Sequence, residues 1–149
     1  MTMAPAPRLE WSDALLLGHG PMDRTHREFV EIVDAMLVDD DTRFADHLAA
    51  FIVHAEGHFG DEDRWMADSG FPAMGCHVDE HAAVLASAHE VQARVRAGDV
   101  AIGREFAAEL ARWFPSHAMH LDSAVAHWLV KQRSGGAPVV LRRNVAQAA

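Results

Sequence analysis

The sequence contains a single cysteine, Cys76, and no tyrosine. One cysteine can form neither an intramolecular disulfide nor a thiolate-rich metal cluster, and such sparing use fits a reducing compartment, so we expect a cytoplasmic protein. No apolar run approaches the ~18–20 residues that cross a bilayer, and residues 1–7 lack the basic-then-apolar pattern of an export signal. We therefore expect neither membrane insertion nor secretion.

Basic residues are also few. Thirteen Lys and Arg stand against 22 Asp and Glu, which gives a formal net charge of −9. A surface of that sign repels nucleic-acid phosphates and anionic lipid, so we expect neither nucleic acid nor membrane as a partner. In contrast, the 149 residues include 11 histidines, and half of the chain is hydrophobic. This length and composition predict one domain with a substantial core.

Four amphipathic segments follow a lead-in that contains Gly18, Gly20 and Pro21. Their apolar residues recur every three or four positions, which predicts helices over about residues 23–38, 41–68, 72–97 and 102–131. We expect Asp41 or Thr42 to cap the second helix, and His117, Ala124 and Trp128 of the fourth to face inward. No segment has the period of two that is typical of a strand. Because short connections between long helices make neighbours antiparallel, we expect an all-α fold, an up-down-up-down four-helix bundle.

The flanking segments differ in composition from the helices. We divide the chain into an extended N-terminal arm (residues 1–10), the bundle (11–133), and a linker with a short C-terminal tail (134–149). The arm is rich in Pro and Ala, and the linker combines Ser, Gly and Pro. The tail carries Arg142 and Arg143, whose charges suit an acidic surface of the bundle or of a partner.

Six ionisable residues occupy inward positions that a bundle normally fills with apolar side chains. They are His26, His58, Glu62, His77, His81 and His117. Burying them is costly unless each finds a partner, and a metal ion accepts lone pairs from imidazole and carboxylate at once. His58 and Glu62 are four residues apart, as are His77 and His81, so each pair shares one helical face. Antiparallel packing of the two helices would bring the pairs level.

The number of candidate ligands predicts two metal ions. Five imidazoles and a Glu exceed the four ligands of tetrahedral zinc and suit two octahedral metals that share carboxylates. Asp122 is the candidate for a second carboxylate. It follows His117 by five residues, which is ~140° around a regular helix, so we expect a widening or kink there, to which Pro115 contributes.

Hydrogen-bonded core packing is the alternative interpretation of these histidines. It is the commoner role of any single inward histidine, but the convergence of several from four helices favours coordination. The remaining six histidines are interpreted as ordinary polar residues. Of these, His54 and His120 lie within one turn of a candidate ligand.

Several stretches resemble the hemerythrin family of non-haem di-iron oxygen carriers, and specifically its short bacterial members. Residues 58–66 are similar to the family's His-Phe-x-x-Glu-Glu … Met. Gly-Phe-Pro at residues 70–72 precedes the His-x-x-x-His of residues 77–81, and residues 113–122 are similar to Trp-Leu-x-x-His-Ile-x-x-x-Asp. The match runs from about Trp11 to Trp128, and the order and spacing of the fragments make it specific.

The resemblance implies two iron ions, Fe²⁺ or Fe³⁺, bridged by an oxo or hydroxo group, with dioxygen as a further ligand. It assigns one iron to His77, His81 and His117, and the other to His26 and His58. It assigns the bridging carboxylates to Glu62 and Asp122. The second iron then keeps one open position, where dioxygen binds.

The same resemblance places Phe59, Trp113, Phe114 and Ala118 around the oxygen pocket. Ordinary core packing is their other interpretation, and both can hold at once. A dry apolar wall withholds the protons and reductant that further reduction of dioxygen needs. Phe114 stands where the family has Leu, and Ala118 where it has Ile, so the wall volume is redistributed between neighbouring turns.

Three functions are consistent with such a site. The first is reversible dioxygen binding for storage, delivery or sensing, by a monomer or weak homo-oligomer that serves an unidentified oxygen-consuming partner. The second is a di-iron enzyme with peroxidase, oxidase or nitric-oxide-handling activity, which a pocket widened at Ala118 favours. The third is a metal buffer or zinc-bound bundle. Recovery of the reduced protein under vacuum separates the first from the second, and metal analysis tests the third.

Overall fold

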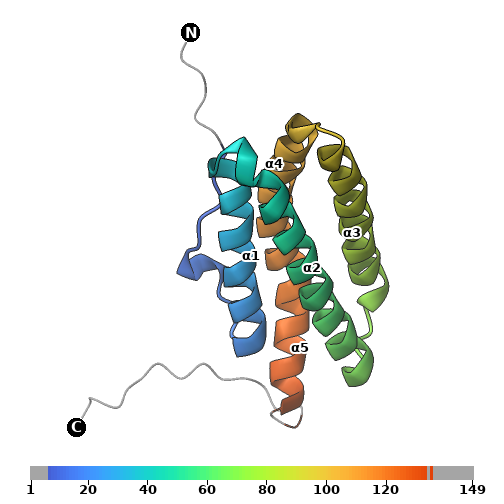
Figure 1. Cartoon of the computed structure of the whole chain (residues 1–149). Helices are drawn as coiled ribbons and strands as arrows, with labels where there is room; N and C mark the ends of the chain where they lie inside the picture. Colours follow the sequence, from blue (N-terminus) through green and yellow to red (C-terminus); the bar gives the residue numbers. More distant parts are fainter. Residues whose placement is uncertain (1–6, 134, 136–149) are drawn as a thin grey trace, which may run out of the picture.

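The computed structural model describes residues 7–133 and 135, and the regular structure within them is helical. The elements are η1 (Asp13–Leu15), α1 (Gly20–Val38), α2 (Asp41–Ser69), α3 (Met74–Arg96), α4 (Val100–His117), η2 (Ala118–Asp122) and α5 (Ser123–Arg133). Because α4, η2 and α5 follow one another without a break, they form a single fourth arm (Figure 1). Successive arms run in opposite directions, which confirms the predicted all-α four-helix bundle.

The first long helix begins earlier than predicted. α1 starts at Gly20, not at residue 23, and Pro21 lies in its first turn. Proline is accepted there because the first N–H groups of a helix have no partner within the helix, and its fixed φ suits the helix. The backbone N–H of Met22 donates to Nδ1 of His19 at 3.3 Å, so this histidine caps the helix.

The next helix ends are fixed by short polar side chains and by glycine. Asp40, one residue before the predicted cap, accepts the N–H of Thr42 at 3.1 Å and starts α2. Asp99 accepts the N–H of Ile102 at 3.1 Å and starts α4. α2 stops at Gly70, which has φ +69°, a left-handed conformation that favours glycine.

Two apolar clusters occupy the interior of the bundle. The larger one is built from all four arms and includes Phe29, Phe44, Phe51 and Leu110. The smaller one consists of the buried residues Met22, Met66, Val125 and Ala126. Along α1, α2 and the fourth arm, the stretch between the two clusters carries the buried ionisable side chains His26, Glu62 and Asp122. The core therefore encloses a polar centre between two apolar layers.

The described end of the N-terminal arm lies against α1. The Arg8 guanidinium donates to both carboxylate oxygens of Asp34, at 2.8 and 2.7 Å, and the Leu9 side chain is buried. Residues 1–6 and most of the predicted linker and tail lie outside the described residues, so docking of the basic tail stays a prediction.

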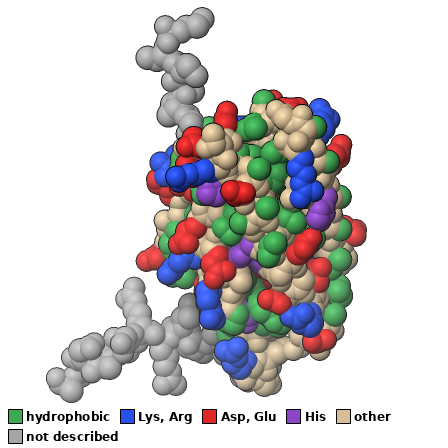
Figure 2. All heavy atoms as spheres, in the orientation of Figure 1, with side chains coloured by type: hydrophobic (Ala, Val, Ile, Leu, Met, Phe, Trp, Pro, Cys, Tyr) green, Lys and Arg blue, Asp and Glu red, His purple; other side chains and the backbone are tan. Residues whose placement is uncertain are grey.

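The described helices give no candidate for a membrane span, since none combines sufficient length with sufficient apolar character. On the face drawn in Figure 2, acidic and basic side chains are interspersed among apolar atoms. This mixed surface agrees with the sequence, in which charged residues of both signs fall on the outward positions of the helices.

Candidate metal centre

Seven ionisable side chains meet in the interior of the bundle. None of them is more than 4% exposed. They are His26 of α1, His58 and Glu62 of α2, His77 and His81 of α3, and His117 and Asp122 of the fourth arm. The structure therefore brings together every residue that the sequence predicted as a metal ligand, and each of the four arms contributes.

The Glu62 carboxylate lies between imidazoles on two sides. Its Oε2 is 2.7 Å from Nε2 of His58, one turn earlier on α2, and 3.3 Å from Nε2 of His26. Its Oε1 is 3.2 Å from Nε2 of His81 and 3.7 Å from Nε2 of His77. The two oxygens of one carboxylate thus face different helices.

The Asp122 carboxylate divides its oxygens in the same way. Its Oδ2 is 2.9 Å from Nε2 of His26, whereas its Oδ1 is 2.7 Å from Nε2 of His77 and 3.2 Å from Nε2 of His117. The site therefore has a two-histidine group (His26 and His58) and a three-histidine group (His77, His81 and His117). Glu62 and Asp122 lie between these groups, and each presents one oxygen to either side.

A π-helix brings the last two of these residues to the same point. η2 follows His117 directly and ends at Asp122, which confirms the predicted widening between them. Pro115 precedes it within α4 and has no N–H to donate to the preceding turn. The sequence prediction continued the inward pattern to Ala124, which was wrong: Ala124 is exposed and Val125 is buried. The wider turn takes up one residue and shifts the inward face of α5 by one position.

Several buried polar atoms of the cluster lack a hydrogen-bond partner within the described part of the chain and are suited to coordinate a cation. Glu62 Oε1, His77 Nε2 and both Asp122 oxygens are buried and have no hydrogen-bond partner among the described residues. His77 Nε2 and Asp122 Oδ1 are 2.7 Å apart without the geometry of a hydrogen bond. Such atoms are costly to bury unpaired, and a set of imidazole nitrogens and carboxylate oxygens suits iron better than a thiolate-preferring metal.

The pKa values of the clustered side chains show how strongly the two carboxylates attract positive charge. Burial alone would lower the pKa of His26 and of His77, but contacts with Asp122 and Glu62 outweigh it and raise each pKa to about 9. Burial alone would raise the pKa of both carboxyl groups, yet the surrounding imidazoles, with His58 the strongest on Glu62, hold both well below their usual range. The two carboxylates are therefore ionised at neutral pH and attract positive charge.

The family model described as the hemerythrin HHE cation binding domain matches residues 18–129. The chain belongs to the hemerythrin family. It is similar to the bacteriohemerythrin of Ralstonia nicotianae, with 38% identity over 126 residues that cover 85% of this chain and 92% of that protein. The bacteriohemerythrin of Pseudomonas paraeruginosa is 28% identical over 139 residues, 86% of this chain and 90% of the relative. No solved structure matches the chain significantly.

Membership of the hemerythrin family implies that the cluster binds non-haem iron. Two sets of side chains have ligand atoms close enough together to hold an ion. One set combines the three-histidine group with both carboxylates, and the other combines the two-histidine group with Glu62.

Two further carboxylates of this hemerythrin domain hold two of the clustered imidazole rings from outside. Nδ1–H of His81 donates to Asp63 at 2.7 Å, and Nδ1–H of His117 donates to Glu80 at 3.1 Å. These bonds fix the ring orientation and leave Nε2 free to face the centre. Glu80 could not be predicted, because its partner His117 lies 37 positions away in the sequence and no local spacing indicates the contact.

The predicted pocket residues lie against the ligand rings. Phe59 stacks on His81 with ring centroids 4.2 Å apart and planes 6° from parallel. Trp113 stacks on His117 at 4.2 Å and 28°. Ala118 is also buried, and the role of these residues as an oxygen pocket stays a prediction.

One aromatic residue beside the two-histidine group was not among the predicted pocket residues. Phe29 stacks on Phe114 at 4.5 Å and lies 6.0 Å from His58 between ring centroids, and Phe114 lies 5.2 Å from His26. We call Phe29, Phe59, Trp113 and Phe114 the aromatic wall.

The two histidines that flank the candidate ligands differ in placement. The His54 ring lies 5.4 Å from that of His58, so it packs beside the centre. His120 is exposed, and its Nδ1–H donates to the carbonyl of Ser116 at 2.9 Å. His120 therefore points away from the centre although it lies on the same arm as His117.

Proposed function

We propose that this chain holds two iron ions through the seven clustered side chains and binds dioxygen reversibly, for storage, delivery or sensing. The observation that carries this proposal is the unequal division of the donors. The three-histidine group lies with both carboxylates and so has five protein donors, whereas the two-histidine group lies with Glu62 and, through His26, with Asp122, and so has at most four. With one bridging oxygen, the three-histidine group and both carboxylates would complete six donors around one metal, and the two-histidine group would leave one position open at the other.

A pair of ferrous ions held by these side chains would supply the two electrons that reversible binding of dioxygen needs. The chain's own side chains set the conditions for that exchange. Glu62 and Asp122 neutralise charge and hold the two sites together. Asp63 and Glu80 fix the orientation of His81 and His117.

The aromatic wall favours reversible binding over turnover. Its four rings cover the side of the cluster next to His26, His58, His81 and His117. Rings in these places exclude water and larger reductants, and so withhold the protons and electrons that would carry reduction of dioxygen further. A di-iron enzyme with peroxidase, oxidase or nitric-oxide-handling activity would need those reactants at the same place.

Metal analysis combined with an optical spectrum tests the proposal. The reduced protein should contain two irons per chain, change its spectrum on exposure to air, and return to the first spectrum under vacuum. Because the sequence has no tyrosine, a visible band cannot come from a tyrosinate–iron complex. Irreversible oxidation with consumption of peroxide would support the enzyme instead, and zinc or no metal would support the buffer.

A pair of histidine variants makes the metal analysis specific. His77→Ala should lower the iron content below two per chain, since it removes a buried donor from the three-histidine group. His120→Ala is the matched control: His120 is exposed, faces away from the centre and should be replaced without loss of iron. Equal iron in both variants would contradict the ligand assignment.

A further inference from the structure

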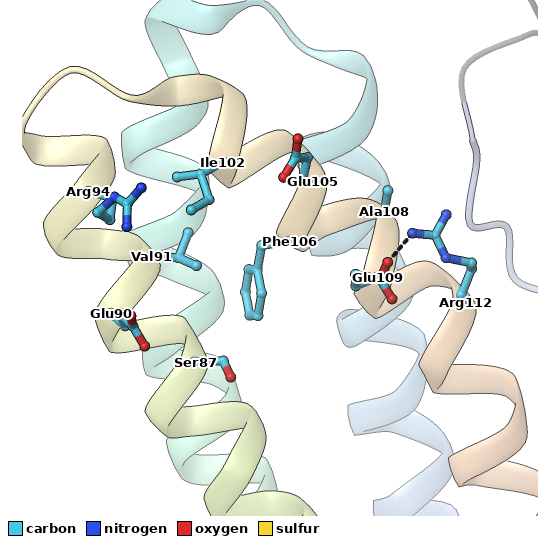
Figure 3. A pocket seen from close by; sticks show the side chains of 10 residues that line it. All are labelled: Ser87, Glu90, Val91, Arg94, Ile102, Glu105, Phe106, Ala108, Glu109 and Arg112. Carbon is cyan, nitrogen blue, oxygen red and sulfur yellow. Dashed lines mark hydrogen bonds and ion pairs between the residues drawn. The ribbon is translucent and has the colours of Figure 1, made fainter.

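A groove runs along the outside of the bundle between α3 and α4. Two adjoining cavities of about 490 and 360 Å³ form it, and they share Ser87, Phe106 and Glu109 in their linings. Figure 3 shows the larger cavity, in which Val91 of α3 and Phe106 of α4 project into the space between the helices. The floor of the groove is apolar, while its exposed rim carries charged side chains.

The smaller cavity extends the groove towards the metal centre. It passes Val84 and Leu110 and ends at Glu80 and Trp113. Trp113 is the one member of the aromatic wall among the residues that line these two cavities. Its indole separates the end of the groove from His117, on which it stacks.

A single carboxylate oxygen holds Trp113 in place. Oε1 of Glu80 accepts the indole N–H of Trp113 at 2.9 Å and also Nδ1–H of His117 at 3.1 Å. The Glu80 side chain is 42% exposed, so this bond lies at the solvent side of the indole. No other group in the described residues accepts the indole N–H, so loss of the Glu80 bond would leave only stacking and packing to hold the ring.

We propose that the groove between α3 and α4 is the access path of dioxygen to the metal centre, with Trp113 as its gate and Glu80 as the latch. This inference rests on the proposed function. An apolar floor suits a small neutral molecule. The path ends at Trp113, whose ring lies 6.4 Å from that of Phe29, and Phe29 in turn lies 6.0 Å from His58 of the group with the open position. The indole must move for passage, and side-chain and loop motions of this kind commonly set binding rates.

A filled groove tests the path. Ala83 is exposed and lines the smaller cavity, and Ala83→Trp should obstruct it. Ala82→Trp is the matched control, since Ala82 is also exposed on α3 but lines neither cavity. An obstruction outside the metal centre raises the barrier that dioxygen must cross, but it does not change the free energy of free or bound dioxygen. Ala83→Trp should therefore lower the association and dissociation rates of dioxygen by the same factor, about tenfold, at unchanged affinity.

Stopped-flow measurements on the reduced iron-loaded protein give both rates. Rates in Ala83→Trp equal to those in Ala82→Trp would overturn the path. A changed affinity with an unchanged association rate would overturn it too, because the substitution would then act on the centre itself.

Three variants test the latch. Glu80→Ala removes the acceptor and should raise the association rate about tenfold. Glu80→Gln keeps a carbonyl oxygen for the indole N–H and should restore a rate near that of the unmodified chain, although it removes the charge beside His117. Trp113→Phe removes the donor and should resemble Glu80→Ala in rate. An association rate in Glu80→Ala equal to that in Glu80→Gln would overturn the latch.

Xenon under pressure supplies a readout that needs no oxygen chemistry. It is an apolar probe that occupies dry cavities. In crystals of the iron-loaded protein we expect xenon between Val84, Leu110 and Trp113, and none there in Ala83→Trp. Xenon bound elsewhere only would overturn the path. Xenon in the groove of a protein that fails to bind dioxygen would contradict the proposed function and not the path.

Discussion

Nε2 of His117 and Oδ1 of Asp122 lie 3.2 Å apart although the two residues are five positions apart in the sequence, because a π-helix joins them. Asp122 reaches both histidine groups from this position. Asp122→Asn should keep the fold and lower the iron content below two per chain, since an amide carries no charge and bridges two cations poorly.

Metal analysis of the purified variant checks this, with Asp79→Asn as the matched control on the exposed side of α3. Full iron content in Asp122→Asn would show that this carboxylate does not bridge the two groups.

A glycine of α4 makes room for an aromatic ring of α2. A Cβ added at Gly103 would lie 2.3 Å from Cε1 and 2.8 Å from Cζ of the buried Phe44 ring. Gly103→Ala should therefore destabilise the fold by ~1–3 kcal/mol through overpacking, in spite of the better helix propensity of alanine. Denaturant unfolding measures the change.

Gly57 is the matched control, because no atom lies within 4 Å of a Cβ built there. Gly57→Ala should stabilise the chain by ~0.5–1 kcal/mol. A neutral or stabilising Gly103→Ala would mean that the two helices have room to separate.

The cap of α1 predicts a dependence of stability on pH. Burial lowers the pKa of His19 below 6.5, and the neutral Nδ1 accepts the N–H of Met22. A lowered histidine pKa means that protonation favours the unfolded chain. The stability contributed by the cap is complete above pH 6.5 and is lost as the pH falls through that value towards the lowered pKa.

His19→Asn supplies a cap that does not titrate. The difference in free energy of unfolding between the unmodified chain and His19→Asn should therefore shift in favour of the variant as the pH falls below 6.5. Parallel curves from pH 8 to pH 5 would show that His19 is not a titrating cap.

Arg104 ties the start of α4 to the end of α1. Its guanidinium donates to the carbonyls of Met36 at 2.9 Å and Asp39 at 2.6 Å, and to the carboxylate of Asp41 at 2.6 Å. Arg104→Met keeps the apolar stem but leaves partly buried carbonyls unpaired, which should cost ~1–3 kcal/mol of unfolding free energy.

Arg112 is the control, because it is exposed and pairs with Glu109 on its own helix. Arg112→Met should change the stability by no more than ~0.5 kcal/mol. Equal losses in the two variants would show that the carbonyl bonds of Arg104 add nothing.

Local spacing was sufficient to predict much of the buried cluster of ionisable side chains. His58 with Glu62, and His77 with His81, share helical faces by their separation of four residues, so their convergence followed from the antiparallel bundle. The spacing of His117 and Asp122 was incompatible with a regular helix, and this conflict predicted the widened turn. The register beyond that turn was mispredicted at Ala124, because the heptad was continued across it.

Contacts between distant segments could not be predicted. Glu80 meets His117 and Trp113 only through the packing of α3 against α4, and Gly103 meets Phe44 only where α4 crosses α2. Neither glutamate nor glycine has a neighbour in sequence that indicates such a partner. Tertiary packing, which a single sequence does not report, decides both.

We propose above all that the chain holds two irons, one of which has an open position where dioxygen binds reversibly. Titration of the reduced, iron-loaded chain with dioxygen, followed by an oxygen electrode and by metal analysis of the same sample, tests it most directly. The account predicts one dioxygen bound per two irons and full release under vacuum. One iron per chain, no uptake, or uptake that vacuum does not reverse would contradict it.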